Sequence, residues 1–335
     1  MAKTALVVSG GGSKGAFAVG ALKYIHQQVQ PLDSFDLYCG TSTGSLIAPL
    51  AACGELALLE KVYTTLRQDD LVKLGSIANL VTGISVHDAT PLKKQIDTLL
   101  TQAHYDRLRA RSTQVYLATV CLQTERLVYW SMQATGDTPH YDVEQVQNVT
   151  DLRRAMLASC CQPVLMQPVE VRLGAVPVRQ YVDGGVREAT PLQAAVDQGA
   201  ETIIAITLNP QQTPADNTRK TSAIQILERT TDLFSEDVGA NDYRLAQLFQ
   251  QSNRYVQAVR QALLARGVAP TLIDQAFTQP QNPFANTAVT TLHDIRPAAR
   301  LDEGGPGGLT FQPAAMQQML QKGYAQAQAY FRALA

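Results

Sequence analysis

The segment GTSTG at residues 40–44 contains a serine whose surroundings suit nucleophilic chemistry. It is a GxSxG motif that follows a short apolar run and precedes a helix-like stretch, which is the order of a nucleophile elbow. Such a turn lifts the serine hydroxyl clear of the backbone, and a helix N-terminus behind Ser42 favours negative charge that develops there. Because GxSxG is common by chance, the motif needs support from the rest of the chain.

A glycine-rich segment, GGGSKG at residues 10–15, ends the first apolar run and opens a helix-like stretch. Backbone N–H groups at such a place can hold a phosphate, or an oxyanion that exists only during a reaction. The glycines fit the dinucleotide fingerprint GxGxxG, and Asp33 and Asp36 lie roughly 20 residues further on. Taken alone, the segment is compatible with a dinucleotide site or a tight structural turn.

The carboxylate best placed to act as a base is Asp183, in the segment YVDGGVREATPL. It ends an apolar run that predicts a strand, and Gly184 and Gly185 let backbone or substrate approach closely. The carboxyl ends of parallel strands are where such folds build their sites. The structural alternative is that Asp183 caps a turn or the next helix.

The histidines give no comparable candidate. An ordinary α/β-hydrolase has several strands before its elbow and uses the chain order serine, acid, histidine, whereas here a single strand precedes the elbow-bearing one. Only His293 is late enough in the chain for that order, and it sits in a predicted strand. None of the five lies in a motif typical of a base, and the structural interpretation is favoured for His26, His87, His104, His140 and His293.

Strand and helix patterns alternate along the chain, which predicts an α/β fold with a mostly parallel sheet covered by helices. Helical spacing of apolar residues near the C-terminus predicts a last helix packed on the core. The predicted strands are residues 4–8, 35–39, 114–120, 126–132, 176–185, 201–208 and 291–297. The predicted helices are residues 13–28, 45–53, 151–161, 190–200 and one or two within 221–265.

Composition excludes several classes of protein. The 335 residues are 45% hydrophobic and 17% charged, enough for a sizeable core, and the net charge of −1 lacks the basic footprint of a nucleic-acid binder. Five cysteines without a CxxC spacing predict neither a disulfide framework nor a zinc site, and indicate a reducing cytoplasm. No apolar run approaches about 18 residues, so no membrane span is expected, although peripheral contact with a membrane surface is compatible with the sequence.

Together, the three motifs in this order resemble the patatin-like phospholipase family. The matching segments are GGGSKG (10–15), GTSTG (40–44) and DGG (183–185), with further agreement in LASCCQPVLMQPVEV before the aspartate and PLQAAVDQGAETIIAITL after it. The resemblance covers about residues 3–210 and, more loosely, about 291–335. It implies a three-layer α/β/α patatin-like fold with a mostly parallel central sheet, as one domain over residues 1–335.

The resemblance also implies a catalytic Ser–Asp dyad without histidine. Ser42 is then the nucleophile and Asp183 the general base, while backbone N–H groups of Gly10, Gly11 and Gly12 form the oxyanion hole. The remaining motif positions support these groups, and they are Lys14, Gly15, Gly40, Gly44, Gly184 and Gly185.

Two positions of the motifs call for comment. Lys14 stands where the family often carries a basic residue, and it is either a contact for an anionic head group or a solvated lysine of the first helical turn. The family often has asparagine two residues before the proline that follows DGG, and here that residue is Ala189, before Pro191. The bracing of the turn after Asp183 is therefore the part of the motif that the resemblance does not explain.

The leading hypothesis is a serine acyl hydrolase that cleaves carboxylic ester bonds of lipids, of the phospholipase A, lysophospholipase or esterase type. It needs no metal or organic cofactor, and its partner is a lipid or ester substrate rather than nucleic acid. The alternative is an acyltransferase that passes the acyl group from Ser42 to an alcohol or thiol. A third hypothesis is a catalytically inactive lipid-binding or scaffold protein. The presence of both Ser42 and Asp183 argues against it.

Residues 211–290 differ in character from the segments on either side. A polar loop, the helical region within 221–265 and an irregular, proline- and glutamine-rich connection over 266–290 follow one another. We expect this helical and irregular insertion to form a lid or an acyl pocket, or otherwise to cover one edge of the sheet.

Overall fold

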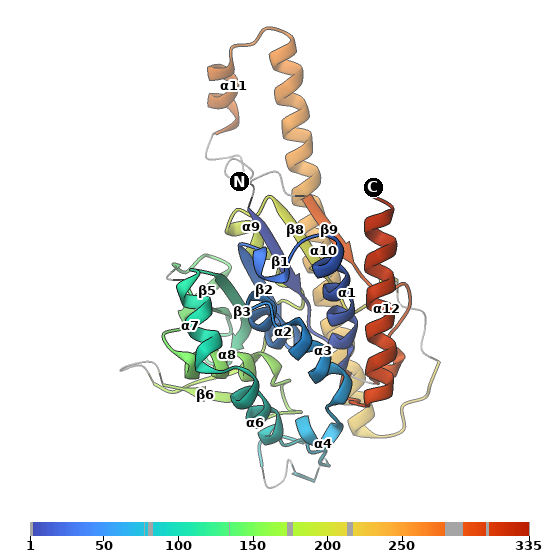
Figure 1. The fold of residues 1–335 in the computed structure, drawn as a ribbon. Coiled ribbons are helices and arrows are strands. Elements are labelled where there is room, and N and C mark those ends of the chain that lie inside the picture. Colours follow the sequence, from blue (N-terminus) through green and yellow to red (C-terminus); the bar gives the residue numbers. More distant parts are fainter. Residues whose placement is uncertain are drawn as a thin grey trace.

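The computed structural model describes residues 3–334 with gaps at 77, 80–82, 134, 173–176, 213–216, 279–290 and 306–307. At residues 224 and 302 only the backbone is described. The described residues form a nine-stranded mixed sheet with helices on both faces (Figure 1). The mostly parallel α/β fold expected from the sequence is confirmed, since five of the eight strand pairings are parallel.

Seven strands follow one another across the sheet in the order β5-β4-β3-β2-β1-β8-β9, and β7 and β6 extend the sheet beside the end of β3. β1 lies at the centre, between β2 and β8, and pairs in parallel with both. The strands are β1 (Thr4–Val8), β2 (Leu37–Thr41), β3 (Gln114–Cys121), β4 (Leu127–Ser131), β5 (Tyr141–Gln145), β6 (Val169–Val171), β7 (Arg179–Asp183), β8 (Thr202–Ile206) and β9 (Thr291–Ile295).

The helices divide unequally between the two faces of the sheet. Seven helices pack on one face, and two, α9 and α10, pack on the other. The first group is α1 (Gly15–Gln28), α2 (Thr43–Ala52), α3 (Leu56–Thr65), α6 (Thr90–Leu99), α7 (Gln102–Ala110), α8 (Val149–Cys160) and α12 (Pro313–Arg332). The second is α9 (Leu192–Asp197) and α10 (Ala223–Ala265), and two short helices, α4 (Gln68–Leu71) and α11 (Pro270–Phe277), lie outside these layers.

The pleat of the strands supplies a core on each face. Along β1, Leu6 and Val8 point to the face that holds α1 and α12, whereas Ala5 and Val7 point to the face that holds α9. All four side chains are fully buried. Because both faces of β1 are covered, its sequence is a continuous apolar run rather than an alternating one.

The C-terminal helix packs on α1 at very short range through two glycines. A β-carbon on Gly323 would lie 1.9 Å from the carbonyl oxygen of Phe17, and one on Gly20 would lie 1.9 Å from that of Leu320. Backbones at this distance leave no room for any side chain, so α12 is fixed on the core although it is the last element of the chain.

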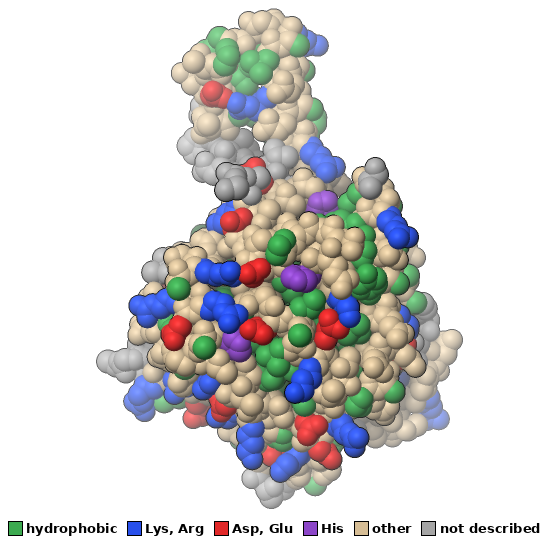
Figure 2. All heavy atoms as spheres, in the orientation of Figure 1, with side chains coloured by type: hydrophobic (Ala, Val, Ile, Leu, Met, Phe, Trp, Pro, Cys, Tyr) green, Lys and Arg blue, Asp and Glu red, His purple; other side chains and the backbone are tan. Residues whose placement is uncertain are grey.

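The segment after β8 forms an arm. The 43-residue helix α10 packs its first half against the sheet and then projects beyond it, where α11 folds back on it (Figure 1). Ile273 of α11 is buried, whereas Leu264 and Leu272 are exposed. Hydrophobic side chains gather towards the tip of the arm in Figure 2. Among the described helices, none is long and apolar enough to cross a membrane.

Several details differ from the sequence prediction. The second strand runs over Leu37–Thr41 rather than 35–39, whereas the region predicted to hold one or two helices is the single helix α10. Part of the connection predicted to be irregular is the helix α11, which proline at its first position starts favourably. The rest of that connection, 279–290, lies outside the described residues. Strands β5 and β6 and helices α3, α6 and α7 had no counterpart in the prediction.

The crossing of α1 and α12 predicts the sign of a substitution. Alanine normally stabilises a helix relative to glycine by roughly 1 kcal/mol, but in Gly323→Ala the new methyl group would overlap the Phe17 carbonyl. We expect a net loss of about 1–3 kcal/mol in the free energy of unfolding, measured by urea denaturation. Gly136→Ala is the control, because a β-carbon there meets nothing within 4 Å. A Gly323→Ala protein at least as stable as wild type would contradict this packing.

Candidate active site

Ser42 occupies a strained turn between β2 and α2. Its backbone angles are φ 54° and ψ −123°, a region that residues other than glycine rarely adopt. The turn is tight because a β-carbon on Gly40 would lie 2.3 Å from the Gly44 carbonyl oxygen, and one on Gly44 would lie 2.1 Å from that of Val8. Glycine at both positions of GxSxG is thus a steric requirement of the elbow.

Hydrogen bonds from distant segments hold this turn in place. The Ser42 N–H donates to Ser159 Oγ over 2.9 Å, and Ser159 Oγ in turn donates to the Ala118 carbonyl of β3 over 2.6 Å. The Ser42 carbonyl accepts from Ser45 Oγ at 2.6 Å and from Cys160 Sγ at 3.2 Å. Burial raises the pKa of the Cys160 thiol, so it stays protonated and able to donate.

Asp183 reaches Ser42 because two strands meet end to end beside β3. The last residue of β2, Thr41, pairs with Ala118, and the next residue of β3, Thr119, pairs with Asp183 of the antiparallel strand β7. The ends of β2 and β7 therefore lie at consecutive positions along one strand, although they are about 140 residues apart in sequence. Ser42 and Asp183 are both buried and line the same cavity.

The electrostatics of Asp183 suit a base. Burial raises the pKa of its carboxyl to about 6, against the opposing effect of the Gly185 N–H and the Ser42 side chain, which hydrogen-bond to the carboxylate. The Gly185 N–H donates to Asp183 Oδ1 over 2.8 Å. Near neutral pH the group is thus ionised, yet basic enough to accept a proton from a hydroxyl.

The glycine loop lies directly beside the elbow. A β-carbon on Gly10 would lie 3.2 Å from Cβ of Ser42, and Gly11 and Gly12 both have positive φ angles. The Gly10 N–H donates to the Ala189 carbonyl over 3.0 Å. Within the described part of the chain, the N–H groups of Gly11 and Gly12 have no acceptor from the protein. Of the three predicted oxyanion donors, these two are the available ones.

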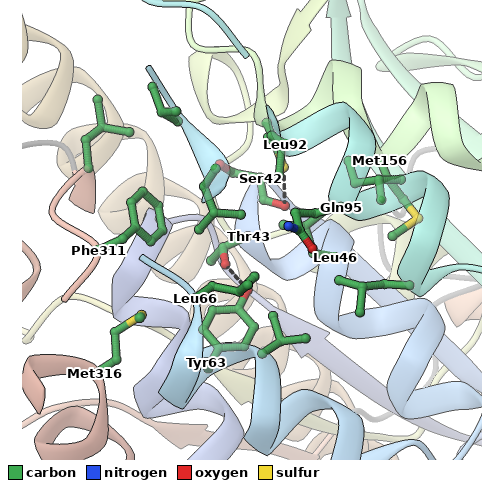
Figure 3. Close-up of a pocket in the computed structure, with 18 of the residues that line it drawn as sticks. Ser42, Thr43, Leu46, Tyr63, Leu66, Leu92, Gln95, Met156, Phe311 and Met316 are labelled. Carbon is green, nitrogen blue, oxygen red and sulfur yellow. Dashed lines mark hydrogen bonds between the residues drawn. The ribbon is translucent and has the colours of Figure 1, made fainter. Parts of the chain in front are cut away.

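An apolar cavity opens beside Ser42 (Figure 3). Its walls come from α2, α3, α4, α6 and α8, from α12 and from the residues that precede α12. In the close-up, Phe311 and Met316 face Thr43, Tyr63 and Leu66 across the space. Its apolar lining comprises Leu46, Leu50, Leu59, Val62, Leu66, Leu71, Val72, Leu92, Ile96, Leu99, Met156, Met166, Leu309, Phe311 and Met316.

A second cavity also borders Ser42, and its lining is more polar than that of the first; it is called the polar cavity below. Asp183, Gly10 and Gly11 line it, whereas Gly12 lines the apolar cavity, and one wall is formed by α10 between Thr231 and Ala240. Lys14, Asp232, Glu236 and Arg296 bring charges of both signs to it. Gln162 borders both cavities, and its Oε1 is buried with no hydrogen-bond partner in the described structure.

The structure brings most of the predicted site residues together. Lys14 is buried at the polar cavity rather than solvated. Gly15 packs against Thr43 and Tyr63, and a β-carbon on Gly184 would overlap the Ala118 carbonyl. All five histidines lie in the described part of the chain, and none lines either of these two cavities. His293, the one late enough for the ordinary order, contacts Tyr330 of α12 instead, through Nδ1 at 3.3 Å.

The predicted lid or acyl pocket within 211–290 can be compared with these cavities. From that segment, Gln211 and the part of α10 between Thr231 and Ala240 line the polar cavity. The residues that line the apolar cavity come from other parts of the chain. Sequence reasoning did not assign roles to Ser45, Ser159, Cys160 and Gln162. No local signal marks them, because each acts through a contact with a residue far away or with the turn itself.

Comparison with known proteins identifies the family of the chain. A family model described as patatin-like phospholipase matches residues 6–196, which include the elbow, the glycine loop and Asp183. The model covers more than half of the chain. The chain therefore belongs to the patatin-like phospholipase family.

Two curated relatives come from Escherichia coli. The protein YjjU of strain K12 is 30% identical over 219 residues, which cover 63% of this chain and 53% of YjjU. A cGAMP-activated phospholipase of strain TW11681 is 26% identical over 200 residues, covering 56% of this chain and 52% of the relative. The match thus spans about half the length of each relative.

Two solved structures align with 99% of this chain. VipD from Legionella pneumophila is 13% identical, with a TM-score of 0.47 and 67% of its chain covered. Human GIVD cytosolic phospholipase A2 is 11% identical, with a TM-score of 0.45 and 59% of its chain covered.

The strain at Ser42 predicts an unusual order of stability between two variants. Glycine adopts the observed backbone angles without the steric cost that alanine and serine carry, which is of order 1–3 kcal/mol. We expect Ser42→Gly to unfold at a higher temperature than Ser42→Ala, in spite of the greater chain entropy of glycine. Thermal unfolding followed by circular dichroism measures this. Equal or reversed midpoints would show that the turn is not strained in solution.

Burial of Asp183 predicts a pH-dependent cost to stability. Its pKa is raised from below 4 in the unfolded chain to about 6 in the fold, so stability is fully retained at low pH and is lost as pH rises through 6. In Asp183→Asn this cost disappears. Relative to the variant, wild type should lose roughly 2–3 kcal/mol between pH 4 and pH 8, measured by urea denaturation. A difference between the two proteins that does not vary with pH would contradict the raised pKa.

Proposed function

We propose that the protein hydrolyses carboxylic ester bonds of lipids through an acyl-enzyme on Ser42, with Asp183 as the general base. The observation that carries this proposal is the placement of the strained Ser42, which borders both an apolar and a more polar cavity, beside the buried carboxylate of Asp183. Membership of the family supports the acyl-hydrolase class, and the geometry supports these residues for these roles.

In the acylation step, Asp183 accepts the Ser42 hydroxyl proton while Oγ attacks the ester carbonyl carbon. The carbonyl oxygen becomes negatively charged and receives hydrogen bonds from the N–H groups of Gly11 and Gly12, which are free of protein acceptors in the described structure. The tetrahedral intermediate then collapses, its bond to the alkoxy group breaks, and the proton on Asp183 passes to the leaving alcohol.

Deacylation repeats these events with water. Asp183 removes a proton from a water molecule, whose oxygen attacks the acyl carbon while the oxyanion is held as before. The bond to Ser42 Oγ breaks, the proton returns to that oxygen, and the fatty acid is released. A single carboxylate suffices because its pKa of about 6 lets it both accept and return a proton near neutral pH.

We propose that the acyl chain and the alcohol part of an ester substrate bind in different cavities. An acyl chain fits the apolar side, where its burial is favourable by about 0.8 kcal/mol for each methylene group. The alcohol half then lies on the polar side, among Lys14, Arg296 and the acidic residues of α10. This arrangement supports a lipid substrate with a hydrophobic acyl chain and a polar alcohol.

Transfer of the acyl group to another alcohol or thiol is the alternative fate of the same acyl-enzyme. Transacylases with a GxSxG elbow usually employ a histidine base, and the histidines of this chain lie away from the cavities around Ser42. We therefore favour water as the acceptor. Product analysis in the presence of glycerol distinguishes the two, because a transferase yields the glycerol ester in place of the free acid.

The dyad predicts both activity loss and a pH profile. Hydrolysis of p-nitrophenyl esters should fall at least a thousandfold in Ser42→Ala and in Asp183→Asn. In wild type, kcat/KM should rise with pH through about 6, since the base works only when it is ionised. His293→Ala is the control and should retain wild-type rates. Activity that survives in Asp183→Asn and is lost in His293→Ala would overturn the assignment.

The apolar cavity predicts a change in chain-length preference. Leu46 lines it one helical turn after Ser42, and Leu46→Trp would fill part of the space with a larger side chain. We expect the optimum in a p-nitrophenyl ester series to move to shorter chains, with the rate on the acetyl ester within about threefold of wild type. Leu272→Trp, on the exposed face of α11, makes the same exchange away from the site. An unchanged optimum in Leu46→Trp would place the acyl chain elsewhere.

A further inference from the structure

Residues 188–190, in the turn that follows Asp183, connect the segments on which the proposed chemistry depends. Glu188, Ala189 and Thr190 are all buried. The Glu188 carbonyl accepts from Thr41 Oγ1 over 3.0 Å, at the end of the strand that carries Ser42. The Ala189 carbonyl accepts from the Gly10 N–H over 3.0 Å. A single turn therefore fixes both the nucleophile strand and the glycine loop.

The turn is held in place from outside by Asp242. Its Oδ2 accepts two hydrogen bonds, from the Ala189 N–H at 2.9 Å and from the Thr190 N–H at 3.0 Å. Asp242 lies on α10, beyond residues 6–196 that the family model matches. A side chain at position 189 could have supplied such an acceptor locally, but alanine has none. The structure thus shows what braces this turn in place of the asparagine that the family often carries.

A second carboxyl shares this buried site. The side chain of Glu188 accepts hydrogen bonds from the Tyr129 hydroxyl and, over 3.1 Å, from the Gln193 N–H, and it borders the same small cavity as Asp242. Burial raises the pKa of Glu188, and the negative charge of Asp242 raises it further. Burial also raises the pKa of Asp242, but its two N–H donors favour the ionised form. We assign the proton to Glu188 and the charge to Asp242.

We propose that Asp242 is a positioning residue for the oxyanion loop, acting through Ala189 on Gly10. The loop needs such a restraint because three consecutive glycines have little conformational preference of their own. With Gly10 fixed, the N–H groups of Gly11 and Gly12 stay aimed at the space beside Ser42. Without Asp242, two buried N–H groups lose their acceptor, the turn shifts, and the donors miss the oxyanion.

The test compares Asp242→Ala, Asp242→Asn and Asp237→Ala. Asp237 lies on the same helix, is exposed, and accepts one hydrogen bond from the Asn241 side chain, so it controls for the loss of an acidic residue from α10. The kinetic readout rests on the proposed function. On a p-nitrophenyl ester we expect kcat to fall ten- to a hundredfold in Asp242→Ala, with KM within about twofold of wild type. Asp242→Asn keeps a neutral acceptor, so its kcat should lie between those of Asp242→Ala and wild type. Asp237→Ala should have the kcat of wild type.

A second readout does not depend on activity. Amide hydrogen exchange of peptides spanning residues 9–14 should be faster in Asp242→Ala than in wild type or Asp237→Ala, because Gly10 loses its fixed partner. If the alanine variant does not fold, Asp242→Asn should show the same changes to a smaller extent. If wild type hydrolyses no ester, the proposed function fails, and exchange alone decides the role of Asp242.

Two results would overturn this proposal. One is a folded Asp242→Ala protein with wild-type kcat and wild-type exchange over residues 9–14. The other is a rise in KM at constant kcat, which would assign Asp242 to substrate binding rather than to the transition state.

Discussion

The backbone of Ser42 has to be held at a positive φ, and much of the surrounding structure serves that constraint. A residue with a side chain leaves such a conformation unless its neighbours over-determine it. Here the carbonyl and N–H groups of Ser42 are both engaged, by Ser45, Cys160 and Ser159. Ser159 is itself fixed on the β3 carbonyl of Ala118. The strain is thus supported by a helix end and a strand that lie more than 70 residues further along the chain.

Pairing with β3 sets the spacing between Ser42 and Asp183. This strand pairs with β2 up to Thr41 and with β7 from Asp183, so the proposed nucleophile and base are spaced by strand register rather than by loops. Register is resistant to small changes, since a one-residue slip would turn every buried side chain of the strand to the other face. The proposed dyad at this junction is therefore positioned by strand register. The Gly185 N–H contributes the remaining restraint on the Asp183 carboxylate.

The local parts of this site could be predicted from sequence, and the long-range parts could not. The elbow, the glycine loop and the Asp183 turn are short motifs whose residue types follow from backbone geometry within a few positions. The central strands were predictable for a similar reason, as continuous apolar runs. Asp242 and Ser159 carry no such signal, because an acidic residue in a long helix or a serine near a helix end is ordinary until the fold brings its partner.

The same distinction explains the errors at the level of elements. The sequence prediction starts the strand before the elbow two residues early, because Phe35 is apolar. In the structure, Phe35 packs into the core but precedes the strand, which begins at Leu37. The segment 266–278 has the composition of a loop, but α11 forms there, packs beside α10 and buries Ile273. In both cases tertiary packing, which a local pattern does not contain, decided the outcome.

The glycine loop has to be held rigid by its neighbours. The insertion between β8 and β9 contributes to this, because α10 holds the turn that contacts Gly10. Glycine allows the close approach to Ser42 but supplies no restraint, whereas electrostatic stabilisation of an oxyanion works only if the donors are oriented before the reaction. Leu208 packs on Gly11, Gly308 packs on Gly12, and Ala189 accepts from Gly10. Leu208 belongs to the segment that follows β8, and Gly308 belongs to the segment that precedes α12. The third contact depends on α10, so the long helix is joined to the core by more than its apolar face.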